Sequence, residues 1–271
     1  MGQVVHTLSE GPTVYAITSL AGEIYLLREK ERDQVEVYDF ITYHLQRCLT
    51  VPDAKDLADM TSCQHYHCVY ISDHRIECIH RLDVQGAATR WPVNDQLWGL
   101  SVNAAHNLLV ACRDVSKIKE FSSHGDLLRE LTLPDDVVNP WHAIQLTTGQ
   151  FVVCHGYVDD AINRVCMISA DGGHIVHSHG GQRGSESGQY DVPRHLAVDN
   201  NEFVFVADIN NRRVTLLSPT LHYVRQVVSS DKLKWHPVRL YLDVQRRRLY
   251  VAENEWKAGK YTSGRVVVFS V

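Results

Sequence analysis

The chain has 271 residues, a formal net charge of −5 and a sequence pI near 6.3. This acidic balance gives no overall attraction to nucleic acid, so net charge does not favour RNA as a partner, although a local basic patch would still allow it. No apolar run approaches the ~20 residues of a membrane-spanning helix, so we expect no membrane association. The length suits one large domain, which we expect to be monomeric.

Seven cysteines are scattered along the chain without a Cys-x-x-Cys pair. Several fall inside predicted strands, where a thiol acts as a small buried hydrophobic group. The first six residues lack the charged and apolar regions of a secretory signal. These observations together predict a reduced protein of the cytoplasm.

Short apolar strands recur along the chain in units of about 45 residues. In chain order, the units are predicted at residues 12–54, 55–95, 96–136, 137–191, 192–232 and 233–271. Their first strands are predicted at 12–17, 59–63, 97–102, 140–144, 193–199 and 237–243. Their second strands are predicted at 23–27, 69–73, 108–112, 150–154, 203–208 and 249–253. Third and fourth strands show the alternation of a half-buried strand, most clearly at 34–38, 45–49, 117–121, 127–131, 211–217 and 223–228.

The repeat is clearest near the C-terminus, where PRHLAVD at 193–199 is followed 44 residues later by PVRLYLD at 237–243. Each copy runs into a second strand that ends in a small residue and an acid, Ala207-Asp208 or Ala252-Glu253. A period of about 40–50 residues with several short strands per unit is typical of a β-propeller. We therefore predict a single-domain, all-β, six-bladed propeller of four-stranded antiparallel blades. Such propellers include both enzymes and binding proteins, so the fold alone does not give the function.

The ring is predicted to close between the two ends of the chain. The last unit ends with the strand at 264–271 and has no fourth strand after it. Residues 1–9 contain the short segment Gln3–Leu8 ahead of the first unit. We expect this segment to pair with the last strand and complete the sixth blade, which would remove exposed sheet edges.

Residues 180–199, GGQRGSESGQYDVPRHLAVD, together with Val206-Ala207-Asp208 and residues 211–214, resemble the NHL repeat. The resemblance is close in the fifth unit, fair in the fourth and sixth, and faint in the first three. NHL propellers occur as C-terminal domains of TRIM-type ubiquitin ligases, where they bind RNA or protein. They also occur in peptidylglycine amidating lyase and resemble streptogramin-lyase-like and lactonase-like propellers. The resemblance therefore implies either a binding platform or a lyase-type or hydrolase-type enzyme.

The family also implies where a site would lie. In such propellers, the loops that enter the innermost strands and the loops between second and third strands reach the same face. The residues at the inner-strand entrances are Thr13, Val14, Asp59, Met60, Trp98, Gly99, Trp141, His142, Arg194, His195, Val238 and Arg239. The residues in the adjacent loops are Arg28, Glu29, Lys30, Arg113, Asp114, His155, Tyr157, Asp208, Asn210, Arg212, Glu253, Asn254 and Trp256.

Our first hypothesis is a non-catalytic recognition platform with its site at the mouth of the channel. The predicted ligand-binding residues are Trp98, Trp141, His142, Arg194, His195 and Arg239. Aromatic faces and guanidinium groups suit a peptide, a protein surface, a small anionic ligand or RNA bases. The structural alternative is that the tryptophans plug the channel and that the two arginines pair with Asp208 and Glu253.

The second hypothesis is a lyase or hydrolase in the central pocket. Its candidate catalytic residues are His142 and His195, which would act as general base or metal ligand. With Asp59 they are also the candidate ligands of one Zn or Ca ion, although Arg239 on the sixth unit would repel a cation. The main expectation is that no cofactor is needed. No nucleophile elbow, phosphate loop or zinc-finger spacing is visible in the sequence.

Overall fold

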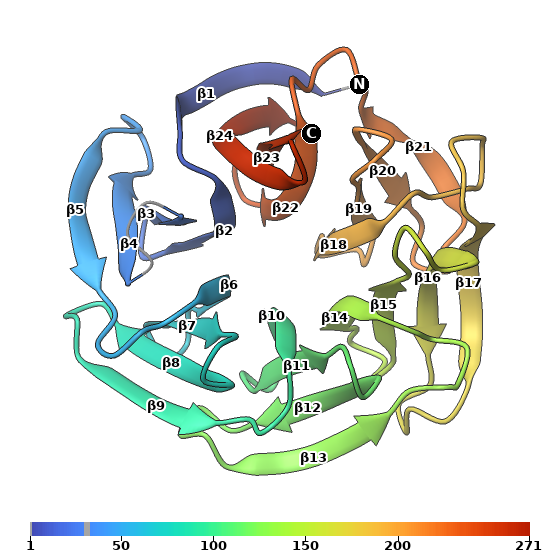
Figure 1. Ribbon diagram of the computed structural model, residues 1–271, viewed down its shortest axis with the longest axis horizontal. Coiled ribbons are helices and arrows are strands. Elements are labelled where there is room, and N and C mark those ends of the chain that lie inside the picture. Colours follow the sequence, from blue (N-terminus) through green and yellow to red (C-terminus); the bar gives the residue numbers. More distant parts are fainter. Residues whose placement is uncertain (1, 30–32) are drawn as a thin grey trace.

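The computed structural model describes residues 2–29 and 33–271, so Lys30 of the predicted rim lies outside the described residues. The described chain forms six four-stranded antiparallel sheets arranged as blades around a central axis (Figure 1). This confirms the predicted all-β, six-bladed propeller. Among the described residues, no helix is long and apolar enough to cross a membrane.

Each blade runs from an innermost strand at the axis to an outer strand at the rim. The innermost strands are β2 (Val14–Leu20), β6 (Leu57–Cys63), β10 (Leu97–Val102), β14 (Pro140–Gln145), β18 (Pro193–Val198) and β22 (His236–Asp243). The second strands are β3 (Glu23–Arg28), β7 (Cys68–Asp73), β11 (Leu108–Cys112), β15 (Phe151–His155), β19 (Val204–Asp208) and β23 (Arg248–Lys257). The third strands are β4 (Gln34–Asp39), β8 (Cys78–Asp83), β12 (Lys117–Phe121), β16 (Ile162–Ile168), β20 (Arg213–Leu217) and β24 (Lys260–Ser270). The outer strands are β5 (Leu45–Thr50), β9 (Ala88–Pro92), β13 (Leu127–Thr132), β17 (Ile175–Gln182), β21 (Tyr223–Val228) and β1 (Gln3–Gly11).

The core lies between the faces of adjacent blades. The second strands are mostly apolar because neighbouring blades cover both of their faces, and every residue of β7, β11, β15 and β19 is buried. Leu27 of β3 and Ile71 of β7 belong to one such inter-blade cluster. The buried cysteines fill the same layers, and burial raises the pKa of the Cys112 thiol to about 12. These thiols therefore serve as small apolar groups, as the sequence predicted.

The two ends of the chain lie in one sheet. Strand β1 pairs antiparallel with β24, from Gln3 opposite Ser270 to Gly11 opposite Gly264, so the sixth blade has the order β1-β24-β23-β22 (Figure 1). Beside this pair, the backbone N–H of Val14 donates to Asn254 Oδ1 at 2.9 Å, and Asn254 Nδ2 donates to the Val14 carbonyl at 2.8 Å. The first and sixth blades are thus also joined through one side-chain amide.

Each innermost strand has a register shift near its start. The register skips the residues Tyr15, Ala58, Trp98 with Gly99, Trp141, Arg194 and Val238. A β-bulge of this kind re-aims the bulged side chain and restores the pairing one residue later. The bulged positions and the positions that follow them therefore form two separate rings around the axis.

Two acids of the second strands, Asp208 at the end of β19 and Glu253 within β23, anchor the loops that lead into the innermost strands. The Asp208 carboxylate accepts a hydrogen bond from the backbone N–H of Asp191 at 2.8 Å, and Glu253 accepts one from Trp235 at 3.1 Å. Both carboxyl groups are fully buried, and burial raises the pKa of Asp208 to about 6. The small-residue–acid ending of the repeat is therefore a structural feature that fixes the rim of the channel.

Candidate ligand-binding site at the mouth of the channel

A cavity of about 490 Å³ opens where the innermost strands of blades three to six begin. We call this cavity the mouth pocket, and its lining residues are Trp98, Arg113, Trp141, Tyr157, Val158, Val192, Arg194, Ile209, Asn210, His236, Trp256 and Tyr261. Three of these residues, Trp98, Trp141 and Arg194, occupy the bulged positions of their strands. The bulges therefore turn the side chains of the repeat toward one opening.

Aromatic rings form most of the pocket wall. The indole rings of Trp98 and Trp141 meet edge to face with centroids 4.8 Å apart, and Tyr157 lies 5.7 Å from Trp141. Trp141 is buried and its Nε1–H donates to the Gly156 carbonyl at 2.9 Å, so its position is fixed. Trp256, on the opposite wall, is 51% exposed and therefore offers apolar surface at the rim.

Two arginines lie over these rings. The Cζ atoms of Arg113 and Arg194 lie 4.3 Å and 4.6 Å from the centroid of the Trp141 ring, which is cation–π distance. Arg113 Nε donates to Asn139 Oδ1 at 3.0 Å, and Arg194 Nη1 donates to the Tyr261 hydroxyl at 3.3 Å. Neither arginine forms an ion pair with a described residue, and the lining contains no carboxylate. The pocket thus holds two positive charges through neutral partners.

The guanidinium of Arg194 is desolvated by its surroundings. Desolvation, with a smaller contribution from the charge of Arg239, lowers the pKa of the Arg194 guanidinium from its ordinary value. The ordinary value is so high that the group stays protonated at neutral pH. Arg194 is therefore a desolvated cation, and a desolvated cation interacts strongly with an anion.

Arg239 does not line the mouth pocket, contrary to the prediction. Arg239 pairs with Ala252 in the sixth blade, and His195 pairs with Ala207 at the equivalent position of the fifth blade. Arg239 therefore stands one position past the bulge and faces the channel. Its Nε lies 2.9 Å from Asp59 Oδ1, and both side chains are buried. The bulged position of the sixth blade is Val238, which carries no charge.

The alternative prediction, in which Arg194 and Arg239 pair with Asp208 and Glu253, is also wrong. The acids of β19 and β23 pair with arginines of the third strands of their own blades, namely Asp208 with Arg213 and Glu253 with Arg265. Arg194 is thereby left without an acidic partner among the described residues. This difference makes Arg194 available to a ligand.

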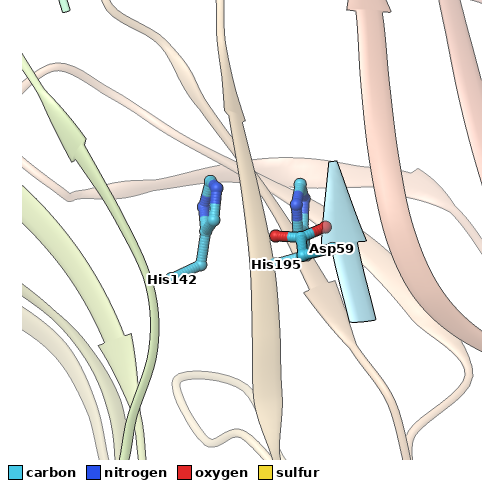
Figure 2. Close-up of side chains that lie close together, drawn as sticks. All are labelled: Asp59, His142 and His195. Atoms are coloured by element: carbon cyan, nitrogen blue, oxygen red, sulfur yellow. The ribbon is translucent and has the colours of Figure 1, made fainter. Parts of the chain in front are cut away.

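His142 and His195 lie deeper in the channel than the mouth pocket. Their imidazole rings stack with centroids 4.0 Å apart and 24° between the planes (Figure 2). His142 Nε2 donates to the Leu100 carbonyl at 3.0 Å, and His195 Nδ1 accepts from the backbone N–H of Leu240 at 3.3 Å. Both line a second cavity, of about 280 Å³, toward the other end of the channel. Burial lowers the pKa of both histidines, so both are neutral at physiological pH.

The structure brings together the three candidate metal ligands, Asp59, His142 and His195, whose ligand atoms lie within 4.8 Å of one another (Figure 2). The chemistry of this set does not fit Zn or Ca. The lone pairs of an imidazole lie in the ring plane, and two stacked rings cannot aim them at one ion. Asp59 is already bound to Arg239 and to the Leu100 N–H, and the acceptor nitrogen of His195 is also used.

The wider predicted rim contains further pocket residues. Arg113, Tyr157, Asn210 and Trp256 were among the predicted loop positions and line the pocket. The lining residues that were missed are Val158, Val192, Ile209, His236 and Tyr261. Tyr261 was missed because β23 and β24 extend beyond the repeat as a hairpin, with Trp256 opposite Tyr261. The turn signal Ala258-Gly259, flanked by these aromatic residues, could have indicated the extension.

No protein-family model and no curated protein matches the sequence. Solved structures do match over the whole chain. A streptogramin B lyase superimposes with a TM-score of 0.67 at 13% identity, over 100% of this chain and 86% of the other. A PQQ-bound aldose sugar dehydrogenase from Streptomyces coelicolor gives 0.71 at 14% identity, over 99% and 98%. The Cps50 (Swd1) β-propeller domain from Myceliophteria thermophila gives 0.63 at 11% identity, over all of both chains.

Identities this low show the fold alone. The protein is a six-bladed β-propeller whose structural neighbours include a lyase and a sugar dehydrogenase, and this fold does not define its function.

Proposed function

We propose that the protein is a non-catalytic recognition platform that binds a small anionic ligand with a flat apolar body in the mouth pocket. The observation that carries this proposal is the pair Arg113 and Arg194, which lie over the ring of Trp141 with no acidic partner among the described residues. The whole chain is acidic, so a cationic pocket stands against the overall charge.

The electrostatics of the pocket favour an anion. Among the described residues, Arg113 and Arg194 donate to the neutral groups Asn139 and Tyr261 and form no ion pair. An anion in the pocket would accept charge-assisted hydrogen bonds from these guanidinium groups. Each such bond contributes roughly 1.5–3 kcal/mol when it is sheltered from water.

The shape of the pocket favours a small, flat molecule. Its volume of about 490 Å³ lies within the ~300–1,000 Å³ of small-molecule sites. The rings of Trp98, Tyr157 and Trp256 offer stacking surfaces around the charges. A macromolecular polyanion is a poorer fit, because acidic residues are next to lining residues in the chain and would repel it. Asp159 and Asp160 follow Val158, and Glu255 precedes Trp256.

The proposal includes an NHL-type origin of the repeat, a monomeric state and a cytoplasmic location, which rest on the sequence patterns. It does not include the lyase or hydrolase alternative. His142 and His195 lie below the mouth pocket, neutral and stacked on each other, and neither lines the cavity that holds the arginines.

A ligand screen tests the proposal. Thermal shift assays on the wild type would compare aryl carboxylates and aryl phosphates with their neutral amides and alcohols, and calorimetry would follow the best pairs. We expect the anions to bind and the neutral partners to bind far more weakly. Arg113→Ala and Arg194→Ala should each weaken binding by roughly 10- to 100-fold.

The matched control is Arg225→Ala, which removes an exposed arginine of β21 outside the pocket and should leave affinity unchanged. If no anion of the panel binds the wild type, or if the double variant of Arg113 and Arg194 binds as tightly as the control, the proposal is wrong.

A further inference from the structure

We propose that the anion recognised in the mouth pocket is a carboxylate, and that its two oxygens are bound by the Nε–H of Arg194 and the indole Nε1–H of Trp98. This inference rests on the proposed function and deepens it, since it names the anion and the two donors that hold it.

Both donors lack an acceptor. The Nε atom of Arg194 and the Nε1 atom of Trp98 are buried, and neither has a hydrogen-bond partner among the described residues. Buried N–H groups in folded proteins are almost always paired, so an unpaired one calls for an explanation. Two unpaired donors in the wall of one pocket indicate a ligand that supplies two acceptors.

The surroundings of Arg194 leave one edge of its guanidinium for this ligand. Its Nη1 donates to the hydroxyl of Tyr261, which occupies the other edge. The Nε edge presents an unpaired N–H that can donate a charge-assisted hydrogen bond to one oxygen of a carboxylate. The guanidinium Cζ lies 5.9 Å from the ring of Trp98, so the indole N–H belongs to the same region of the pocket.

The ring of Trp98 is held in place from two sides. It meets Trp141 at 4.8 Å and His74 at 4.1 Å, both edge to face. Its N–H is therefore presented in a fixed position, and it is the only hydrogen-bonding atom of the side chain. Such preorganisation lowers the entropy cost of binding.

The number of unpaired donors favours a carboxylate over a phosphate. A phosphate group carries a further oxygen that has no counterpart among the two unpaired donors, whereas Val158, Val192 and Ile209 give the body of a ligand an apolar wall. A planar anion with two oxygens matches the two unpaired donors and leaves the apolar wall to the body of the ligand. Arg113 then supplies a second positive charge nearby.

Two substitutions test this assignment. Trp98→Phe keeps an aromatic ring and removes only the N–H, and Arg194→Lys keeps the charge and removes the Nε–H. The probes are 2-naphthoate, its neutral amide and 2-naphthyl phosphate, measured by calorimetry. We expect 2-naphthoate to bind the wild type more tightly than the phosphate does, and each substitution to reduce its affinity about tenfold.

The stability of the ligand-free variants provides the second readout. Since Trp98→Phe removes a buried donor that has no partner, its thermal midpoint should equal or exceed that of the wild type. A loss of stability without a loss of affinity would mean that the N–H has a structural role, and would overturn the inference.

The outcomes separate this inference from the proposed function. If both variants bind 2-naphthoate as the wild type does, or if the wild type prefers the phosphate, the assignment of the donors is wrong while anion binding stands. If the wild type binds neither anion of this pair nor any other anion of the panel, the proposed function itself fails.

Discussion

Arg239 of β22 and Asp59 of β6 form a buried ion pair across the channel, with Nε 2.9 Å from Oδ1. They come from the sixth and the second blade, which are not neighbours in the ring. Between them, the first blade has Ala16 at the equivalent position, directly after its bulge. We infer that this small side chain leaves the room through which Arg239 reaches Asp59.

Breaking this pair should destabilise the protein strongly. Arg239→Met leaves the Asp59 carboxylate buried without its cation, and a broken buried pair typically costs about 3–5 kcal/mol. The free energy of unfolding in urea measures the loss. Replacing both residues, as in Asp59→Leu with Arg239→Met, should recover a large part of it, because no uncompensated charge then remains. A loss below ~1 kcal/mol for Arg239→Met would contradict the pairing.

The sequence predicted the ring because the repeat is a local signal. The copies at 193–199 and 237–243 give the period, and the period gives six blades. The same alignment matches Arg194 with Val238 and His195 with Arg239, so the position of Arg239 in the channel was already implied. The channel position of Arg239 was missed because a shift of one residue along the strand moves a side chain from the mouth pocket to the channel. The bulge that sets this position is not visible in the sequence.

The site could be predicted only in part. Trp98, Trp141 and Arg194 were found because they stand at repeat positions. The pairing of Arg239 with Asp59 depends on a distance across the ring, which no local pattern encodes. Tyr261 lies on a hairpin extension of the sixth blade and so has no counterpart in the repeat from which to infer it.

Gly99 should not tolerate a side chain. It stands at the channel position of the third blade, and a Cβ built on it would lie 2.8 Å from His142 Cα, closer than real Cβ contacts. Gly99→Ala therefore forces β10 and β14 apart, and overpacking of this kind costs about 1–3 kcal/mol. Chemical denaturation would measure the cost. Gly173→Ala, whose Cβ would meet only Asp171 at 3.5 Å, is the control and should change stability little.

His155 should make the protein less stable in acid. Desolvation, together with the charge of Arg164, lowers the pKa of its buried imidazole to about 4 in the folded state, against ~6.5 in an unfolded chain. The unfolded state therefore binds more protons between these two values. The contribution is fully present above about pH 6.5 and is lost as the pH falls toward 4, by roughly 3 kcal/mol in total.

The test compares His155→Gln with the wild type, since other groups titrate in the same range. Asp208, whose pKa is raised to about 6 by burial, has the opposite sign, because its contribution is lost as the pH rises. Its effect cancels in the comparison. Urea midpoints measured between about pH 8 and pH 4 should fall less steeply for the variant. Parallel curves would show that His155 is not the group responsible.

Removing residues 1–9 should unfold the protein. Strand β1 covers β24, whose Val266 and Val268 are fully buried, and Leu8 of β1 is itself only 2% exposed. Without β1, the edge of β24 would expose unpaired backbone groups and apolar side chains, which favours aggregation. Circular dichroism and size-exclusion chromatography would report the loss of the fold. The matched control is Val5→Thr, at a position that is 45% exposed, which should keep stability within about 0.5 kcal/mol of the wild type. A truncated chain that remained monomeric and melted cooperatively at the wild-type temperature would show that the ring is held closed by other contacts, the most direct being those of Asn254 with Val14.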